Sequence, residues 1–176
     1  MTDNDPERWL AEVKAGTDAR TRRRQRWLEQ QDSEAATLQG LLHDLAESPA
    51  EAIVDTRSSG RHRGRVRGVG LDVVIIASNR SQGLTLLSLA DTVSVRSGDN
   101  SAVRATRSRG PTFDATMQEL LVDQMAERNE LTLVLVTGER IMGRLVSVGH
   151  DIVGLRRSVD DPTMQIVIAA IAAAII

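Results

Sequence analysis

Residues 134–148 read Val-Leu-Val-Thr-Gly-Glu-Arg-Ile-Met-Gly-Arg-Leu-Val-Ser-Val, and this stretch decides the fold. Thr137-Gly138-Glu139 is a turn signal between two β-rich runs, so the stretch predicts two strands joined by a short turn. Gly143 stands in the middle of the second run, where a residue without a side chain lets a strand bend sharply. The sequence therefore predicts a bent strand pair over residues 131–148.

The same stretch occurs a second time, 79 residues earlier in the chain. Residues 36–90 align with residues 115–169 without a gap, and 15 of the 55 aligned positions are identical. These identities are Ala36/Ala115, Thr37/Thr116, Gln39/Gln118, Leu41/Leu120, Leu42/Leu121, Asp44/Asp123, Glu51/Glu130, Arg61/Arg140, Gly64/Gly143, Arg65/Arg144, Val69/Val148, Gly70/Gly149, Asp72/Asp151, Val74/Val153 and Ala90/Ala169. A repeat of this length indicates two copies of a small domain. Because such small units have marginal cores, we expect them to pack on each other or on another chain.

Each copy is predicted to be one helix followed by five short strands. Apolar residues at i, i+3, i+4 and i+7 predict helices at 33–48 and 112–129, the second capped by Thr112 or Asp114. Strands are predicted at 52–57, 61–69, 71–78, 84–89 and 92–96 in the first copy, and at 131–136, 140–148, 152–157, 164–170 and up to Ile176 in the second. Residues 6–31 read as a further helix whose thin apolar stripe needs a partner.

A helix followed by five strongly bent strands resembles the Sm-like fold, the small barrel of Sm and Sm-like proteins and of the bacterial host-factor RNA chaperone. Residues 134–148 are similar to that family's first motif, and Gly64 and Gly143 hold the place of its mid-strand glycine. The resemblance implies an α+β, mainly β chain with two tandem Sm-like or SH3-like five-stranded barrels, each preceded by a helix. It divides the chain into an N-terminal helical arm (1–32), unit one (33–96), a linker (97–111) and unit two (112–176).

The resemblance concerns the fold more than the family's uridine pocket. The Arg-Gly of the second motif is replaced by Leu89-Ala90-Asp91 and Ile168-Ala169-Ala170, and the pocket's Asn has no counterpart. Other SH3-like barrels fit the strand pattern as well, and a fold does not decide a function. Asp72 and Asp151, each two residues after a repeated glycine, are predicted to accept backbone N–H bonds in a turn.

The composition narrows the class of protein. The chain has no Cys, and the three His show no zinc-ligand spacing, so we expect no disulfide, metal or cofactor. No nucleophile elbow, phosphate loop or paired catalytic carboxylates appear, which predicts a non-catalytic protein with no catalytic residue. The apolar run 165–176 is too short to span a bilayer. We therefore expect a cytoplasmic, bacterial protein without a membrane partner, the origin being suggested by its single Lys among 22 basic residues.

Positive charge gathers in the middle of the chain. Residues 57–110 carry ten Arg and three Asp, whereas the flanking segments are acidic. Side chains alternate along a strand, so Arg61, Arg63, Arg65 and Arg67 share one face, and Arg140, Met142, Arg144 and Val146 take that face in the second copy. Four arginines in a row repel one another unless an anion or an acidic partner lies beside them. The face is a contact stripe for phosphates, a solvated edge strand that its charges protect from pairing, or a face neutralised by the acidic helices.

Two other groups of arginines extend this hypothesis. Arg104, Arg107 and Arg109 in the linker would lengthen the stripe. Arg22, Arg23 and Arg26 belong to a basic cluster of the arm, which is either a second nucleic-acid contact or an exposed helix paired with Glu29, Asp32 and Glu34.

Two functions from different classes fit these features. The first is a non-catalytic nucleic-acid-binding protein that contacts the backbone of RNA, or less readily DNA, through the arginines of unit one. Neither unit has a Trp or Tyr for base stacking, so such binding would be led by phosphates and sensitive to salt. The second is a protein–protein assembly module that forms homo-oligomers through barrel edges and recruits a partner through the N-terminal helix.

Overall fold

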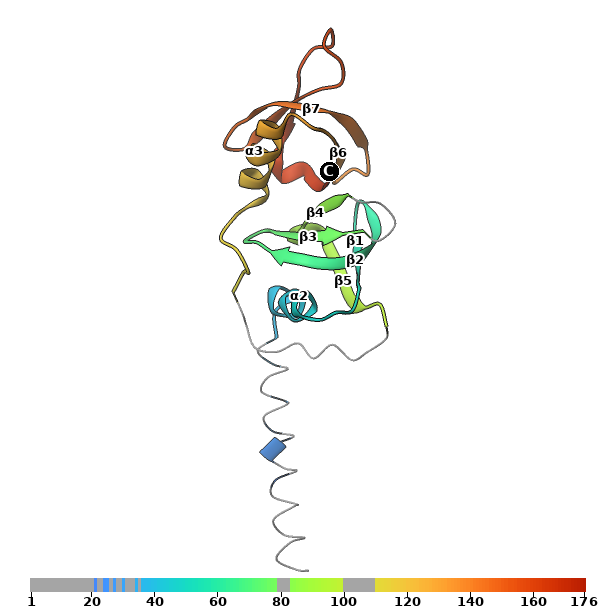
Figure 1. Cartoon of the computed structure of the whole chain (residues 1–176), viewed down its shortest axis with the longest axis vertical. Coiled ribbons are helices and arrows are strands. Elements are labelled where there is room, and N and C mark those ends of the chain that lie inside the picture. Colours follow the sequence, from blue (N-terminus) through green and yellow to red (C-terminus); the bar gives the residue numbers. More distant parts are fainter. Residues whose placement is uncertain are drawn as a thin grey trace, which may run out of the picture.

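The computed structural model describes residues 21, 24, 25, 27, 30, 34, 36–78, 83–99 and 110–176 (Figure 1). The first copy, unit 1, consists of α2 (Leu38–Glu47), β1 (Ala52–Thr56), β2 (Gly60–Val69), β3 (Val73–Ala77), β4 (Leu84–Ser88), the 3-10 turn η1 (Leu89–Asp91) and β5 (Thr92–Ser97). The second copy, unit 2, consists of α3 (Met117–Glu127), β6 (Glu130–Leu135), β7 (Arg140–Val148), β8 (Ile152–Arg156), β9 (Met164–Val167), η2 (Ile168–Ala170) and β10 (Ile171–Ile175). The fold is therefore α+β and mainly β, as the sequence predicts.

The ten strands form one antiparallel sheet in the order β5-β1-β2-β3-β4-β10-β6-β7-β8-β9. Each unit supplies five neighbouring strands in the same relative order, and the two sets meet where β4 pairs with β10. The sheet is open, with β5 and β9 at its two edges. Figure 1 shows the two units one above the other along the long axis of the molecule, with β4 facing unit 2. We call the β4–β10 contact the joint.

The duplication read from the sequence is also a repeat of strand registers. Ala52 lies opposite Gly64 in unit 1, and Leu131 lies opposite Gly143 in unit 2, 79 residues later. The other ladders within the units show the same offset, including the irregularities in the β2–β3 and β7–β8 pairs. The two copies therefore keep the same backbone pairing while most of their side chains differ.

Each mid-strand glycine lies where its strand changes from one pairing partner to the next. Residues 60–64 of β2 pair with β1, and residues 65–69 pair with β3, so β2 changes its partner at Gly64. A Cβ on Gly64 would lie 2.1 Å from the carbonyl oxygen of Ala77, and one on Gly143 would lie 2.6 Å from that of Arg156. The glycines are required because the backbone of the next strand occupies the side-chain position.

Both helices start later than the periodicity predicts. The N-caps are Thr37 and Thr116, which accept hydrogen bonds from Gly40 N and Glu119 N. The predicted capping of the second helix by Thr112 or Asp114 is wrong. Thr112 is used elsewhere, since its N–H donates to the carbonyl oxygen of Val69, and its hydroxyl accepts from the N–H of the same residue.

Two clusters of buried side chains form the core, and each crosses the joint. The first contains mainly residues of unit 2 but includes Val73 and Leu86 of unit 1. The second contains mainly residues of unit 1 but includes Val134 and Ala173 of unit 2. Because each unit completes the other's core, the expectation that they pack on each other is confirmed.

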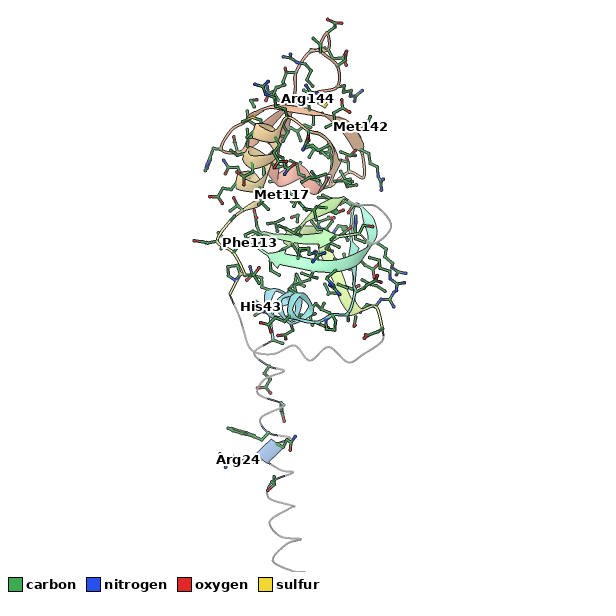
Figure 2. All side chains as sticks on the ribbon, in the orientation of Figure 1. Arg24, His43, Phe113, Met117, Met142 and Arg144 are labelled. Atoms are coloured by element: carbon green, nitrogen blue, oxygen red, sulfur yellow. The ribbon has the colours of Figure 1, made fainter. Side chains whose placement is uncertain are left out.

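Hydrogen bonds between the turn after β2 and the start of α3 also hold the two units together. The carboxylate of Asp72 accepts from Met117 N at 2.7 Å, at the first turn of α3. The prediction is confirmed in part, since Asp72 accepts a backbone N–H, but the donor lies in the other unit and not in the turn. The carboxylate of Asp151 accepts no backbone N–H among the described residues. Leu71 N donates to the carbonyl oxygen of Ala115 at 2.9 Å. Figure 2 shows Met117 and Phe113 where the chain passes from unit 1 into α3.

The apolar C-terminal run is a central strand. Ala172, Ala173 and Ala174 of β10 are fully buried between β4 and β6. Among the described residues, no helix is both long and apolar enough to cross a membrane. In the arm, the described residues between 21 and 34 have helical backbone and exposed side chains, and the other residues of the predicted helix 6–31 lie outside the described part.

Gly64→Ala is expected to destabilise the chain by about 2 kcal/mol or more, because the added methyl group meets a backbone oxygen that cannot move aside. The measurement is the free energy of unfolding from a urea titration followed by circular dichroism. Gly110→Ala is the matched control, since a Cβ there has no atom within 4 Å. Equal stability of the two variants would contradict the role assigned to Gly64.

Candidate nucleic-acid interface

The outward face of β2 carries the four arginines that the sequence singles out. Arg61, Arg63, Arg65 and Arg67 are all exposed, whereas Gly64 and Val66 between them are buried. The alternation predicted from the sequence is therefore present in the structure. Arg61, Arg63 and Arg65 follow the regular alternation and form a row of positive charge about 6–7 Å apart, as expected for every second residue of a strand. Arg67 lies at the irregularity between Val66 and Gly68 and is exposed beyond them.

Arg61 and Arg63 are paired with acidic side chains, one on β1 and one directly before it. Asp55 lies directly opposite Arg61, and Arg61 Nε donates to Asp55 Oδ1 at 2.6 Å. Arg63 Nε donates to Glu51 Oε2 at 2.5 Å. The hydrogen bond from Arg61, followed by that from Ser94, lowers the pKa of Asp55, and Asp55 in turn raises the pKa of Arg61. These two arginines are held by acidic partners within the chain itself.

The other half of the row has no acidic partner in the described part of the chain. Arg65 donates through Nη2 to the carbonyl oxygen of Pro49 at 3.1 Å. Arg67 is exposed and has neither a hydrogen-bond partner nor an ion-pair partner among the described residues. The charge available to an anion in unit 1 is therefore concentrated at Arg65 and Arg67.

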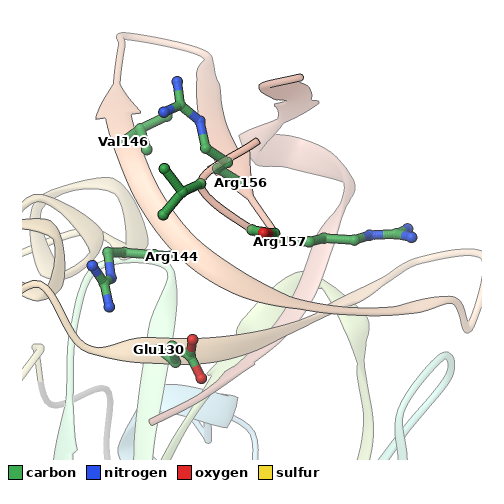
Figure 3. A pocket seen from close by; sticks show the side chains of 7 residues that line it. Glu130, Arg144, Val146, Arg156 and Arg157 are labelled. Atoms are coloured by element: carbon green, nitrogen blue, oxygen red, sulfur yellow. The ribbon is translucent and has the colours of Figure 1, made fainter. Parts of the chain in front are cut away.

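Unit 2 has a basic face at the equivalent place. Glu130 lies opposite Arg144, and Arg144 lies opposite Arg156, so three strands place these side chains in one row across β6, β7 and β8. They line an open hollow of about 360 Å³ together with Val146, Arg157, Ser158 and Val159 (Figure 3). Three arginines thus surround a hollow that contains one carboxylate.

The guanidinium groups of this hollow point in different directions. Figure 3 shows Arg144, Arg156 and Arg157 directed away from one another. Arg156 donates through Nη2 to Thr163 Oγ1 at 3.1 Å, while its Nε is buried and has no partner among the described residues. Arg144 and Arg157 have no described partner. Spread charges of this kind suit an extended polyanion better than a single small anion.

Arg156 and Arg157 were not predicted from the sequence as members of this face. Arg65 and Arg144 are identical in the two copies, and that identity was a usable signal for a shared outward face. The remaining predicted contacts, Arg104, Arg107 and Arg109 of the linker and Arg22, Arg23 and Arg26 of the arm, lie outside the described residues.

A polar cluster lies where the β1–β2 turn meets unit 2. His62 Nε2 and Ser59 Oγ are 2.8 Å apart, and Ser59 Oγ is 2.7 Å from Thr56 Oγ1. The buried carboxylate of Asp91 accepts from the N–H and the hydroxyl of Ser58. Asp91 thus holds the turn, and it has no hydrogen bond to His62 among the described residues. The cluster therefore lacks the orienting acid of a Ser-His-Asp triad.

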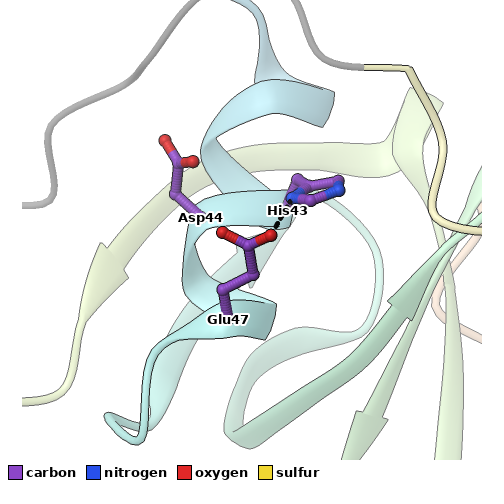
Figure 4. Close-up of side chains that lie close together, drawn as sticks. All are labelled: His43, Asp44 and Glu47. Carbon is purple, nitrogen blue, oxygen red and sulfur yellow. Dashed lines mark ion pairs between the residues drawn. The ribbon is translucent and has the colours of Figure 1, made fainter.

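One group of possible metal ligands occurs on α2. His43, Asp44 and Glu47 offer ligand atoms within 4.8 Å of one another, and His43 Nδ1 is 3.6 Å from Glu47 Oε1 (Figure 4). All three come from one stretch of helix, and both carboxylates take part in further interactions. Side chains four residues apart on a helix meet in this way without a metal, so we assign none.

The sequence matches no protein-family model and no curated protein.

The stability of the chain is expected to depend on pH through His62. Its pKa is lowered, first by burial and then by the charge of Arg140, while Asp91 opposes the shift. The unfolded chain therefore binds more protons than the folded chain between the lowered pKa and about 6.5, so stability falls as pH drops through that window. We expect the urea midpoint to fall between about pH 7 and pH 5 more steeply for the wild type than for His62→Gln. Identical pH slopes would rule out this contribution.

Proposed function

We propose that the chain is a non-catalytic nucleic-acid-binding protein that contacts the phosphate backbone through the outward arginine faces of both units. The observation that carries the proposal is the recurrence of these faces at equivalent registers, around Arg65 in unit 1 and around Arg144 in unit 2. In unit 1, four arginines stand against Asp55 and Glu51, which leaves a formal charge of +2. In unit 2, three arginines stand against Glu130, again leaving +2.

The geometry of the faces favours a backbone over a small ligand. The arginines are distributed along strands, and the guanidinium groups around the hollow diverge. Nucleic acids present regularly spaced phosphates that such a distribution can meet, and each contact releases counterions. Among the described residues, the only aromatic side chain beside the strands is Phe113, which packs against Gly68 and Gly70. The binding would therefore be weakly sequence-specific and sensitive to salt.

We further propose that each unit is a small Sm-like or SH3-like barrel and that RNA is preferred to DNA. The support is the order of elements, a helix and then five strands in the order β5-β1-β2-β3-β4, together with the bend at a mid-strand glycine in both copies. The preference for RNA, and a bacterial and cytoplasmic setting, rest on the resemblance to the Sm-like family and on composition.

An assembly module is a second candidate, which the joint favours. In the joint, an edge strand of one unit pairs with an edge strand of the other, so edges of this kind are suited to pairing. A role of the N-terminal arm in recruiting a partner belongs to this candidate.

The decisive measurement is fluorescence anisotropy of a labelled single-stranded RNA and of a DNA duplex, at about 50 and 200 mM salt. We expect RNA to bind at the lower salt, and the affinity to fall by about tenfold or more at the higher salt. Arg63→Glu with Arg65→Glu is expected to weaken binding at least about tenfold, because the phosphate contact of Arg65 becomes repulsive and the change at Arg63 removes the cation that neutralises Glu51.

Arg128→Glu is the control for this pair, since Arg128 follows α3 in unit 2 and lies outside the row on β2. Circular dichroism would verify that each variant is folded. Unchanged RNA binding by the folded Arg63→Glu, Arg65→Glu variant would remove the face of unit 1 from the proposal. No binding of either nucleic acid at the lower salt would remove the proposal as a whole.

A further inference from the structure

The two edge strands of the described sheet correspond, through the repeat, to the two strands that pair at the joint. At the joint, β4 of unit 1 pairs with β10 of unit 2. The 79-residue repeat makes β9 the equivalent of β4, and β5 the equivalent of β10. Among the described strands, β9 and β5 are the two that have a partner on one side only. A second copy of the chain therefore presents the complement of each free edge.

We propose that β9 of one copy pairs antiparallel with β5 of a second copy, in the register of the joint. In the joint, Leu87 lies opposite Ala173 and Leu86 lies opposite Ala174. Subtracting 79 from the residues of β10 and adding 79 to those of β4 gives the register of the new contact. It places Ile166 opposite Ser94, and Gln165 opposite Val95.

Exposed apolar side chains mark the two surfaces that would meet. Val73 and Met117 are 0% and 3% exposed, and both belong to the cluster that crosses the joint. Their equivalents at the free ends, Ile152 beside β9 and Leu38 at the start of α2, are 40% and 37% exposed. Contact between two copies would bring Ile152 against Leu38, as Val73 and Met117 are brought together at the joint.

A second pair of positions shows the same difference. Ala172 of β10 is fully buried, whereas Val93, its equivalent on β5, is 65% exposed. An isolated exposed Val is ordinary, but here it lies on an edge strand together with other apolar positions that the repeat places in a contact.

The polar contacts of the joint also have equivalents. Asp151 corresponds to Asp72, whose carboxylate accepts from the first N–H of α3. In the contact between copies, Asp151 would accept from Leu38 N, the first N–H of α2, which a helix leaves without an intrahelical partner. His150 N would donate to the carbonyl oxygen of Ala36, as Leu71 N donates to that of Ala115.

The contact between copies is expected to be weaker than the joint. Ser94 and Arg96 on β5 stand where β10 has Ala173 and Ile175, so less apolar surface is buried. The association should therefore depend on concentration. Its two sides are different surfaces, so the contact is head-to-tail, and copies add until a ring closes or a chain of copies ends.

This inference deepens the assembly candidate and does not depend on nucleic-acid binding by the arginine faces. The test is the mass of the full chain in nucleic-acid-free buffer, measured by analytical ultracentrifugation over a range of protein concentrations. We expect species larger than one chain at high micromolar concentration. A single species with the mass of one chain at every concentration would overturn the inference.

Two single substitutions locate the contact. Ile152→Asp is expected to block the β9 end, and Leu38→Asp the β5 end, so each variant alone has the mass of one chain. Both side chains are partly exposed, and circular dichroism verifies that the variants fold. Met142→Asp is the matched control, because Met142 is exposed on the outward face of β7, away from both edges, and this variant should still associate.

Mixing the two variants separates a head-to-tail contact from a symmetric one. The Ile152→Asp chain retains an intact β5 end, and the Leu38→Asp chain retains an intact β9 end, so the mixture should form a dimer and nothing larger. Association of Ile152→Asp with itself, or failure of the mixture to form the dimer, would overturn the pairing of β9 with β5. A wild-type chain that associates but binds no RNA would contradict only the proposed function.

Discussion

The pairing of β4 with β10 is the interaction on which the rest of the structure depends. A unit of this size has too little interior to be more than marginally stable alone. At the joint, Val73 and Leu86 complete the core of unit 2, while Val134 and Ala173 complete that of unit 1. The contact also places Asp72 at the start of α3. One edge-to-edge contact thus joins two small sheets into one continuous sheet with shared cores.

This constraint explains where the two copies could diverge. Side chains on the inward face and at the joint are packed on all sides, so apolar residues persist there. In the described part of the chain the outward side chains of β2 and β7 are exposed, and there Met142 and Val146 in one copy correspond to Arg63 and Arg67 in the other. Strongly charged surface accumulates there because it disturbs no packing. The proposed nucleic-acid contact and the proposed contact between copies therefore use separate parts of each unit, a face and an edge.

The sequence allowed the arginine row to be predicted, but its electrostatics depended on the strand pairing. Alternation along one strand is a local property, so Arg61, Arg63, Arg65 and Arg67 could be placed on one face without any tertiary information. Their partners could not. Asp55 lies beside Arg61 because of the β1–β2 register, and Arg156 lies beside Arg144 because β8 pairs with β7. The register between two strands is set by their pairing, which side-chain alternation along one strand does not determine.

The sequence by itself determined the duplication, the helix-then-five-strands order and the glycine at each bend, because periodicity and the lack of a side chain act over a few neighbouring residues. The ends of the helices were decided by tertiary contacts. Thr112 could have capped α3, but its backbone and hydroxyl bind Val69 at the end of β2, so the helix starts after Thr116. Only the tertiary structure decided that the units share one sheet, because pairing β4 with β10 joins edges far apart in the chain and is favoured by the apolar surface that both units bury together.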